Sequence, residues 1–139
     1  DPFCVDRHRE DFRKLVAGAL DFVLSNEAEL KSLYQIDDLD AALDAAAQEC
    51  EIVVCTRAGE GVSIRRREER VDVAVKPLIP VDATGAGDLF ASGFLYGLVQ
   101  GAPLEICGKM GCASAGEVIR HVGPRPARDL KEVFAEAGL

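Results

Sequence analysis

The chain has 139 residues, of which 48% are hydrophobic and 29% are charged. This composition is typical of one folded domain and excludes a disordered tail, a collagen-like chain and a coiled coil. The 24 acidic and 16 basic residues give a formal net charge of −8, which makes broad binding to a nucleic-acid backbone an electrostatic mismatch.

The N-terminal third of the chain is predicted to form helices around one strand. In the segment after Pro2, apolar residues recur at helical spacing. The apolar run 22–24 predicts a short buried strand. Ser25 or Asn26 can cap a helix that follows it, and an Ala-rich helix is predicted over residues 37–46.

Strands dominate the predicted middle of the chain. The apolar run 52–55 predicts a second buried strand, which resumes over 62–64 after two glycines. The mixed-sign stretch 65–70 predicts a solvated hairpin turn. Apolar and polar residues then alternate over 71–75, which predicts a half-exposed strand that Pro77 ends.

Helical spacing returns at Ala86 and predicts three further helices. The second of these begins near Pro103, and the third carries apolar residues within 130–137. The first two are rich in Gly and Ala, so we expect them to pack closely together. Buried strands separated by helices indicate an α/β sheet with helices on its faces.

Cysteines and hydropathy bear on the compartment. None of the five cysteines has the two-residue spacing of a zinc or thioredoxin motif, so buried, reduced thiols are expected. No apolar run approaches the roughly 18 to 20 residues that a membrane span needs. We therefore expect a cytoplasmic protein that is not embedded in a membrane.

The most informative stretch is the glycine-rich turn at residues 82–88, which precedes a strongly periodic helix. Gly85 and Gly87 let the backbone approach a ligand closely, and the first amides of the helix carry the positive end of its dipole. Such a turn can bind a phosphate, and Asp88 could accept a proton from an attacking hydroxyl group. On residue types alone, the alternative is a helix start at which Asp88 only interacts with the dipole.

Residues 82–90 resemble the signature near the C-terminal end of the ribokinase-like (PfkB) carbohydrate and nucleoside kinases, whose usual form is Asp-Thr-x-Gly-Ala-Gly-Asp-x-Phe. Only Ala83 departs from it, because Thr is commoner there. The resemblance implies that Asp88 is the catalytic base that activates the acceptor hydroxyl group. It implies that Asp82 lies near a structural or monovalent-cation site, for which K⁺ is a candidate. It also implies an anion hole formed by the backbone amides of Gly85, Ala86, Gly87 and Asp88.

Asn26 and Glu29 fit a second motif of the family, Asn-x-x-Glu, which helps to position Mg²⁺ and phosphates. An amide and a carboxylate three residues apart share one helix face, so the geometry is plausible without the family. By resemblance, Asn26 contacts the nucleotide and Glu29 binds Mg²⁺ through water. The alternative is an ordinary capped helix.

Residues 56–61 resemble the loop Thr-x-Gly-x-x-Gly, which contacts the phosphates and sugar of the nucleotide in this family. Ala58 stands where the first glycine is usual, and a positive φ there would cost energy. Arg57 lies near a phosphate or is merely solvated, and both interpretations stay open. By resemblance, the nucleotide-binding residues of this loop are Thr56, Arg57, Gly59 and Gly61.

The resemblance runs from Asn26 to about Pro126, where residues 123–126 are similar to a Gly-Ala-x-Pro turn near the end of these kinases. It implies that residues 1–139 form the C-terminal part of a ribokinase-like three-layer α/β/α sandwich, a partial sheet flanked by helices. The N-terminal portion, which binds the acceptor and carries a lid in the family, has no match in the chain. We therefore expect an exposed sheet edge, either covered by a second copy in a homodimer or left prone to aggregation.

The function implied by the resemblance is transfer of the γ-phosphate of Mg-ATP to a hydroxymethyl group of a sugar or nucleoside, with a ribose-like or adenosine-like acceptor. Mg²⁺ and ATP would be the cofactors, and the fragment alone is expected to be inactive. The alternative is a non-catalytic nucleotide- or anion-binding module that does not need Asp88. A dinucleotide-binding oxidoreductase fits less well, because the glycine-rich turn comes late and no acidic residue ends a following strand.

Overall fold

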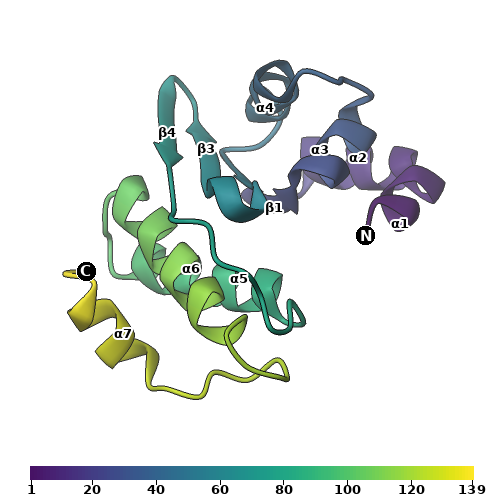
Figure 1. Cartoon of the computed structure of the whole chain (residues 1–139). Helices are drawn as coiled ribbons and strands as arrows, with labels where there is room; N and C mark the ends of the chain where they lie inside the picture. Colours follow the sequence, from purple (N-terminus) through teal and green to yellow (C-terminus); the bar gives the residue numbers. More distant parts are fainter. The chain divides into compact units, whose positions relative to one another are not determined.

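The computed structural model describes residues 1–139 as seven α-helices, one short 3-10 helix and four β-strands (Figure 1). The helices are α1 (Pro2–Arg7), α2 (Arg9–Gly18), α3 (Glu27–Tyr34), α4 (Leu39–Ala47), α5 (Ala86–Val99), α6 (Leu104–Val118) and α7 (Leu130–Glu136). The strands are β1 (Phe22–Asn26), β2 (Ile52–Thr56), β3 (Val62–Arg66) and β4 (Glu69–Val73), and the 3-10 helix η1 spans Ala58–Glu60.

The chain divides into two compact units. Unit 1 comprises Asp1–Ala58 and Val62–Asp72, and unit 2 comprises Gly59–Gly61 and Val73–Leu139. Unit 1 therefore contains the sheet with helices α1 to α4, and unit 2 contains helices α5 to α7.

The first predicted helix is two helices, so the prediction of a single one was wrong. His8 leaves the helical conformation, with φ −119° and ψ 27°, and its amide donates to the carbonyl of Cys4 to end α1. The carbonyl of His8 then accepts the amide of Phe12, which starts α2. The apolar residues of α2, of which Val16 is buried, keep the helical spacing. The spacing of apolar residues alone therefore does not reveal that the helix is interrupted at His8.

The sheet of unit 1 has the order β1-β2-β3-β4. β1 and β2 are parallel, with Phe22 opposite Ile52 and Asn26 opposite Thr56, and α3 and α4 form the connection between them. β3 runs antiparallel to β2. β1 is an outer strand, so one of its edges has no strand partner in the chain, as expected for a partial sheet.

The core of unit 1 lies where α3 and α4 pack near the β1–β2 pair. Its buried side chains come from both helices and from β2, which explains why the Ala-rich pattern of α4 and the apolar run of β2 predicted these elements correctly. The members of this cluster are Val16, Leu30, Leu33, Ala42, Leu43, Ala46, Cys50, Val53 and Cys55.

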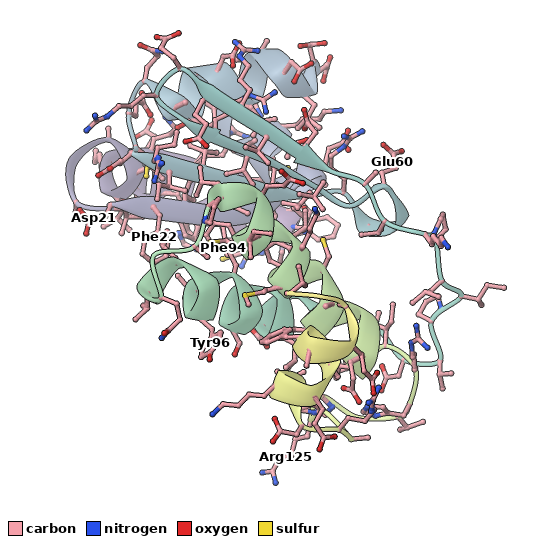
Figure 2. All side chains as sticks on the ribbon, turned by 90° about the vertical axis from the view of Figure 1, so that its left-hand side faces the viewer. Asp21, Phe22, Glu60, Phe94, Tyr96 and Arg125 are labelled. Atoms are coloured by element: carbon pink, nitrogen blue, oxygen red, sulfur yellow. The ribbon has the colours of Figure 1, made fainter.

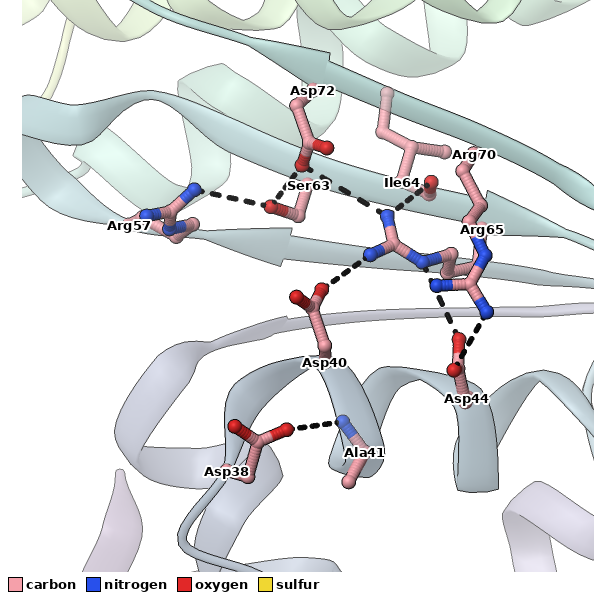
Figure 3. A network of polar contacts seen from close by, with 10 residues as sticks. All are labelled: Asp38, Asp40, Ala41, Asp44, Arg57, Ser63, Ile64, Arg65, Arg70 and Asp72. Carbon is pink, nitrogen blue, oxygen red and sulfur yellow. Dashed lines mark hydrogen bonds and ion pairs between the residues drawn. The ribbon is translucent and has the colours of Figure 1, made fainter.

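The charged stretch 65–70 is not simply a solvated turn, which corrects the prediction. Arg65 lies on β3 and is only 3% exposed (Figure 3). Its Nη2 donates to Asp40 Oδ1 at 2.6 Å, its Nη1 donates to the Ile64 carbonyl oxygen at 3.1 Å, and Asp44 Oδ1 lies 3.6 Å from its Nε. Burial of a charge is costly unless it is paired, and two carboxylates of α4 meet this requirement.

The second strand of the hairpin lies two residues earlier than predicted. β4 spans Glu69–Val73, whereas the alternation predicted a strand of the same length over 71–75. Asp72 accepts from the hydroxyl group of Ser63 at 2.5 Å, and Ser63 is in turn contacted by Arg57 (Figure 3). The Asp72 side chain, which the alternating pattern placed in solvent, is thus hydrogen-bonded to Ser63 across the β3–β4 pair.

In unit 2, α5 and α6 pack closely, as their composition predicted. A Cβ atom at Gly93 would lie 2.4 Å from Ser114 Oγ and 2.5 Å from the Met110 carbonyl oxygen, so only glycine fits there. On α5, Phe94 is fully buried whereas Tyr96 is 42% exposed, and the two leave the helix on different sides (Figure 2). The Tyr96 ring stacks on Phe134 of α7 at 5.9 Å between centroids.

Helix lengths and hydropathy also bear on membranes. None of the helices combines the length and the apolar character that a membrane crossing requires.

Candidate functional site

The glycine-rich turn forms the start of α5. Gly85 is the N-cap residue, with φ 81° and ψ 0°, and its carbonyl accepts the amide of Leu89 at 2.9 Å in the first helical hydrogen bond. The first-turn amides of Gly87 and Asp88 have no acceptor within the helix, and both residues are exposed. The positive end of the dipole of this 14-residue helix therefore meets solvent beside the Asp88 backbone.

Glycine is required at position 85 for two reasons. Its φ lies in the left-handed region, and a Cβ atom there would come within 2.7 Å of Pro124 Cβ. The turn is thus seated directly against the segment that follows α6.

Asp82 closes the turn from the other side. Its Oδ1 accepts the Thr84 amide and its Oδ2 accepts the Gly123 amide, both at 2.9 Å. Hydrogen bonds from Thr84, together with that from Gly123, lower the pKa of Asp82 to about 2. The structure therefore gives Asp82 a clear structural role, while its predicted part in binding a monovalent cation stays a prediction.

This hydrogen bonding predicts a pH dependence of stability. A carboxyl group whose pKa falls from 3.8 to about 2 on folding stabilises the folded state above pH 3.8, and this contribution is lost as the pH falls through about 2. We expect the unfolding free energy, measured in urea from about pH 5 to about pH 2, to fall less steeply in Asp82→Asn than in the wild type. Asp11→Asn on the surface of α2 serves as the control, and equal slopes for wild type and Asp82→Asn would contradict the assignment.

Asn26 and Glu29 form a capping box at the start of α3. Asn26 Oδ1 accepts the Glu29 amide at 2.9 Å, and Glu29 Oε2 accepts the Asn26 amide at 2.9 Å. The other carboxylate oxygen, Oε1, contacts the α-amino group of Asp1. The structural alternative given by the sequence is therefore confirmed, and the role in binding Mg²⁺ stays a prediction.

Thr56 and Asn26 lie next to each other because they end adjacent parallel strands in register. The Thr56 hydroxyl group donates to the carbonyl oxygen of Ser25 at 3.4 Å. Arg57, the next residue, donates from Nη1 to Ser63 Oγ at 3.4 Å, so it is not merely solvated. The carboxyl ends of parallel strands are where α/β sheets bind ligands, and the structure thus gathers Asn26, Glu29 and Thr56 at such an edge.

The loop after β2 has the backbone that the sequence suggested. Ala58 takes a positive φ of 47°, a conformation that costs a non-glycine residue about 1–2 kcal/mol. Gly61 has φ 103°, and a Cβ atom there would lie 1.9 Å from the Val73 carbonyl oxygen, so no side chain fits. At Gly59 a Cβ atom would make only ordinary contact with Pro77. Gly59 and Gly61 belong to unit 2, where Asp82 and the turn at residues 85–88 also lie.

Unit 2 also contains a cavity of about 720 Å³ that the sequence did not reveal. The segment 73–78 forms one wall, and the face of α6 that carries Cys112, Gly116 and Glu117 forms another. Burial raises the pKa of the Cys112 thiol to about 11, which keeps it neutral and unreactive near neutral pH. The only signal in the sequence was the run of small residues on α6, which predicted close packing rather than a cavity.

The fold and the glycine-rich turn can now be compared with known proteins. The profile described as pfkB family carbohydrate kinase matches residues 1–130. The chain belongs to the pfkB family. An uncharacterized sugar kinase of Archaeoglobus fulgidus is 34% identical to it over 120 residues, which cover 86% of this chain and 48% of that protein.

Two solved structures of pfkB-like kinases match almost the whole chain. A probable sugar kinase from Rhizobium etli superposes with a TM-score of 0.95 at 48% identity. An adenosine kinase from Sinorhizobium meliloti superposes with a TM-score of 0.94 at 42% identity. Each match covers 99% of this chain but 42% of the solved chain, so the chain spans less than half the length of these relatives.

Membership of the pfkB family confirms the predicted family and the predicted ribokinase-like α/β fold. The relatives that match include sugar, nucleoside and adenosine kinases. The roles predicted for single residues of the pfkB signature, including Asp88, stay predictions.

Proposed function

We propose that the chain is the nucleotide-binding and catalytic-base portion of an ATP-dependent kinase that phosphorylates a hydroxymethyl group of a sugar or nucleoside. The observation that carries this proposal is the start of α5, where the Gly85 cap leaves first-turn amides open and Asp88 stands in the same turn. Membership of a family of sugar and nucleoside kinases supports it.

In this mechanism Asp88 accepts the proton of the acceptor hydroxyl group as its oxygen attacks the γ-phosphorus of ATP. The bond from that phosphorus to the bridging oxygen breaks, and ADP leaves. The amides of Gly85, Gly87 and Asp88 stabilise the charge on the transferring phosphoryl group. The Ala86 amide, which donates to the Ala83 carbonyl oxygen at 3.2 Å, joins this anion hole only when that hydrogen bond opens. Mg²⁺, when bound with ATP, would neutralise charge on the phosphates.

We assign the cofactor contacts to residues at two places. At the strand ends of unit 1, Asn26, Thr56 and Arg57 would contact the nucleotide, and Glu29 would hold Mg²⁺ through water. In proteins Mg²⁺ usually keeps several water ligands and binds one or two carboxylates, which is consistent with this assignment. Gly59 and Gly61 contribute backbone to the nucleotide site, and Asp82 is the candidate for K⁺.

The cavity of unit 2 is our candidate for the adenosine part of ATP. Its volume of about 720 Å³ lies within the range of small-molecule sites, roughly 300 to 1,000 Å³. The small side chains at Cys112 and Gly116 leave room for a flat ring, and Lys76 and Arg120 add positive charge to the lining. Five cysteines that form no disulfide bond, of which three are buried, fit a protein of the reducing cytoplasm.

The test is binding of ADP to the 139-residue chain by isothermal titration calorimetry, with a cavity-blocking variant. We expect Cys112→Trp to weaken ADP binding at least about tenfold, because the indole fills the cavity. Val99→Trp adds the same side chain at an 81% exposed position outside the cavity lining and should leave the affinity unchanged. Equal affinities in the two variants would remove the cavity from the proposal.

Turnover is tested by ADP release from Mg-ATP in a screen of sugars and nucleosides. We expect none from these 139 residues alone, because the resemblance assigns acceptor binding to the N-terminal portion of such kinases. A protein that includes that portion should respond to an acceptor with a hydroxymethyl group. Turnover by the 139 residues alone would show that the acceptor site lies within them.

The second candidate function is a non-catalytic nucleotide- or anion-binding module. The observation in its favour is that the turn at residues 82–88 and its supports all lie within unit 2. Such a module would bind ADP without any requirement for the Asp88 carboxylate. ADP binding without turnover in any longer form of the protein would favour it.

A further inference from the structure

The segment that joins α6 to α7, residues 119–129, supports the glycine-rich turn at three points. The carbonyl oxygen of Ile119 accepts the Val81 amide at 2.8 Å. The amide of Gly123 donates to Asp82, and Pro124 packs against Gly85. The position of the turn therefore depends on the position of this joining segment, which contains neither helix nor strand.

The backbone at the far end of the joining segment is held by the carboxylate of Glu117, in the last turn of α6, while the Arg128 side chain pairs with Glu136. Glu117 is 7% exposed, and its Oε1 accepts the amides of Ala127 at 3.0 Å and Arg128 at 3.2 Å. The Nε2 atom of His121 lies 3.5 Å from the same oxygen, while Oε2 is buried without a hydrogen-bond partner. Burial of a carboxylate is costly, so the two amides that satisfy Oε1 are strongly held in place.

We propose that Glu117 is a positioning residue for the anion-binding turn at the start of α5. It holds residues 127–128 against α6, and so restricts the joining segment whose residues 123–124 hold Asp82 and Gly85. Glu117 makes no contact of its own with the turn. Nothing in the pfkB signature points to this residue, because it lies outside the glycine-rich motif and acts through backbone amides ten residues further on.

The competing interpretation is a purely local anchor, in which Glu117 only fastens the segment that leads into α7. The two differ in how far the effect of a substitution spreads. A local anchor affects the amides of Ala127 and Arg128 alone. A positioning residue also affects the amides of Thr84 and Gly123, which donate to Asp82.

Amide hydrogen exchange, measured by NMR on the 139-residue chain, distinguishes a positioning residue from a local anchor. We expect Glu117→Leu, which removes the acceptor, to speed exchange at Thr84 and Gly123 about tenfold or more. Glu117→Gln keeps a hydrogen-bond acceptor but loses the charge, so we expect exchange at these two amides to become about two- to fivefold faster. Glu105→Leu and Glu105→Gln are the matched controls on α6, because the Glu105 carboxylate pairs with the Lys109 side chain and should leave both amides unchanged.

Faster exchange confined to Ala127 and Arg128 would overturn the proposal. Interior amides of α5, such as that of Phe94, report whether each variant is folded. If Glu117→Leu does not fold, the exchange rates of the Thr84 and Gly123 amides in Glu117→Gln decide between the two interpretations. Equal exchange at Thr84 and Gly123 in Glu117→Gln and Glu105→Gln would also overturn it.

The consequence for ligand binding rests on the proposed function and has a separate readout. Titration with inorganic phosphate, followed by the amide shifts of Gly87 and Asp88, should give at least about tenfold weaker binding in Glu117→Leu than in Glu105→Leu. If the wild type itself shows no phosphate-dependent shifts, the proposed anion site fails, whereas the exchange pattern still decides the role of Glu117. Unchanged phosphate affinity in Glu117→Leu would show that the turn is positioned without it.

Discussion

Replacement of Asp88 by Asn is expected to lower kcat by about 10²- to 10⁴-fold, the usual contribution of a general base. Asparagine has the size and shape of aspartate but cannot take up the proton of the acceptor hydroxyl group. The backbone amides of the first turn of α5 remain in place, so ADP should bind with nearly unchanged affinity. The loss therefore appears in kcat rather than in nucleotide binding.

The measurement is ADP release from Mg-ATP, made on a form of the protein that turns over an acceptor, with calorimetry for ADP. Asp11→Asn on the surface of α2 makes the same chemical change outside the turn and should keep wild-type kcat. Unchanged turnover in Asp88→Asn would remove this residue from the mechanism. A parallel loss of ADP binding would instead assign Asp88 a role in holding the nucleotide or the turn.

The largest effect on stability is expected at Gly93, where α5 meets α6. An alanine there would place Cβ 2.4 Å from Ser114 Oγ and 2.5 Å from the backbone oxygen of Met110. Relief of this overlap requires the helices to move apart, so we expect Gly93→Ala to lower the unfolding free energy by about 3 kcal/mol. The gain in helix propensity, about 1 kcal/mol for Gly to Ala, is too small to offset the overlap.

Urea unfolding of Gly93→Ala and Gly116→Ala provides the comparison. At Gly116, inside α6, a Cβ atom would meet only Leu78 Cδ1 at 3.8 Å, an ordinary contact. That variant should therefore be as stable as the wild type or up to about 1 kcal/mol more stable. Equal stabilities of the two variants would show that α5 and α6 are not as closely packed as the structure has them.

Local features of the fold could be predicted from the sequence because they depend on neighbouring residues. Asn26 and Glu29 cap α3 through bonds between residues three positions apart. The glycine at position 85 has the positive φ that a turn into a helix requires. Apolar runs identified β1 and β2, whereas the parallel register that brings Asn26 beside Thr56 is a finding of the structure.

Features that depend on distant residues escaped the sequence analysis. Arg65 lies in a run of charges that predicts solvent, and its burial depends on ion pairs with Asp40 and Asp44, more than twenty positions earlier, and with Asp72 on β4. Glu117 interrupts an apolar helix pattern, and the hydrogen-bond donors to its carboxylate are backbone amides of a segment without regular structure. The cavity in unit 2 was not predicted for the same reason, because its walls come from segments that are far apart in the sequence.

The glycine contacts between α5 and α6 have a consequence for motion. At Gly93 the α5 backbone lies close to the Met110 carbonyl oxygen of α6, and at Gly111 the α6 backbone lies close to the Phe90 ring of α5. Interiors packed this closely resist sliding and rotation of one helix against the other. We therefore expect the first turn of α5 to move together with α6, and mobility measurements should find α5 among the least mobile segments of unit 2. On the proposed function, closure around a nucleotide would then come from the loops around this helix pair.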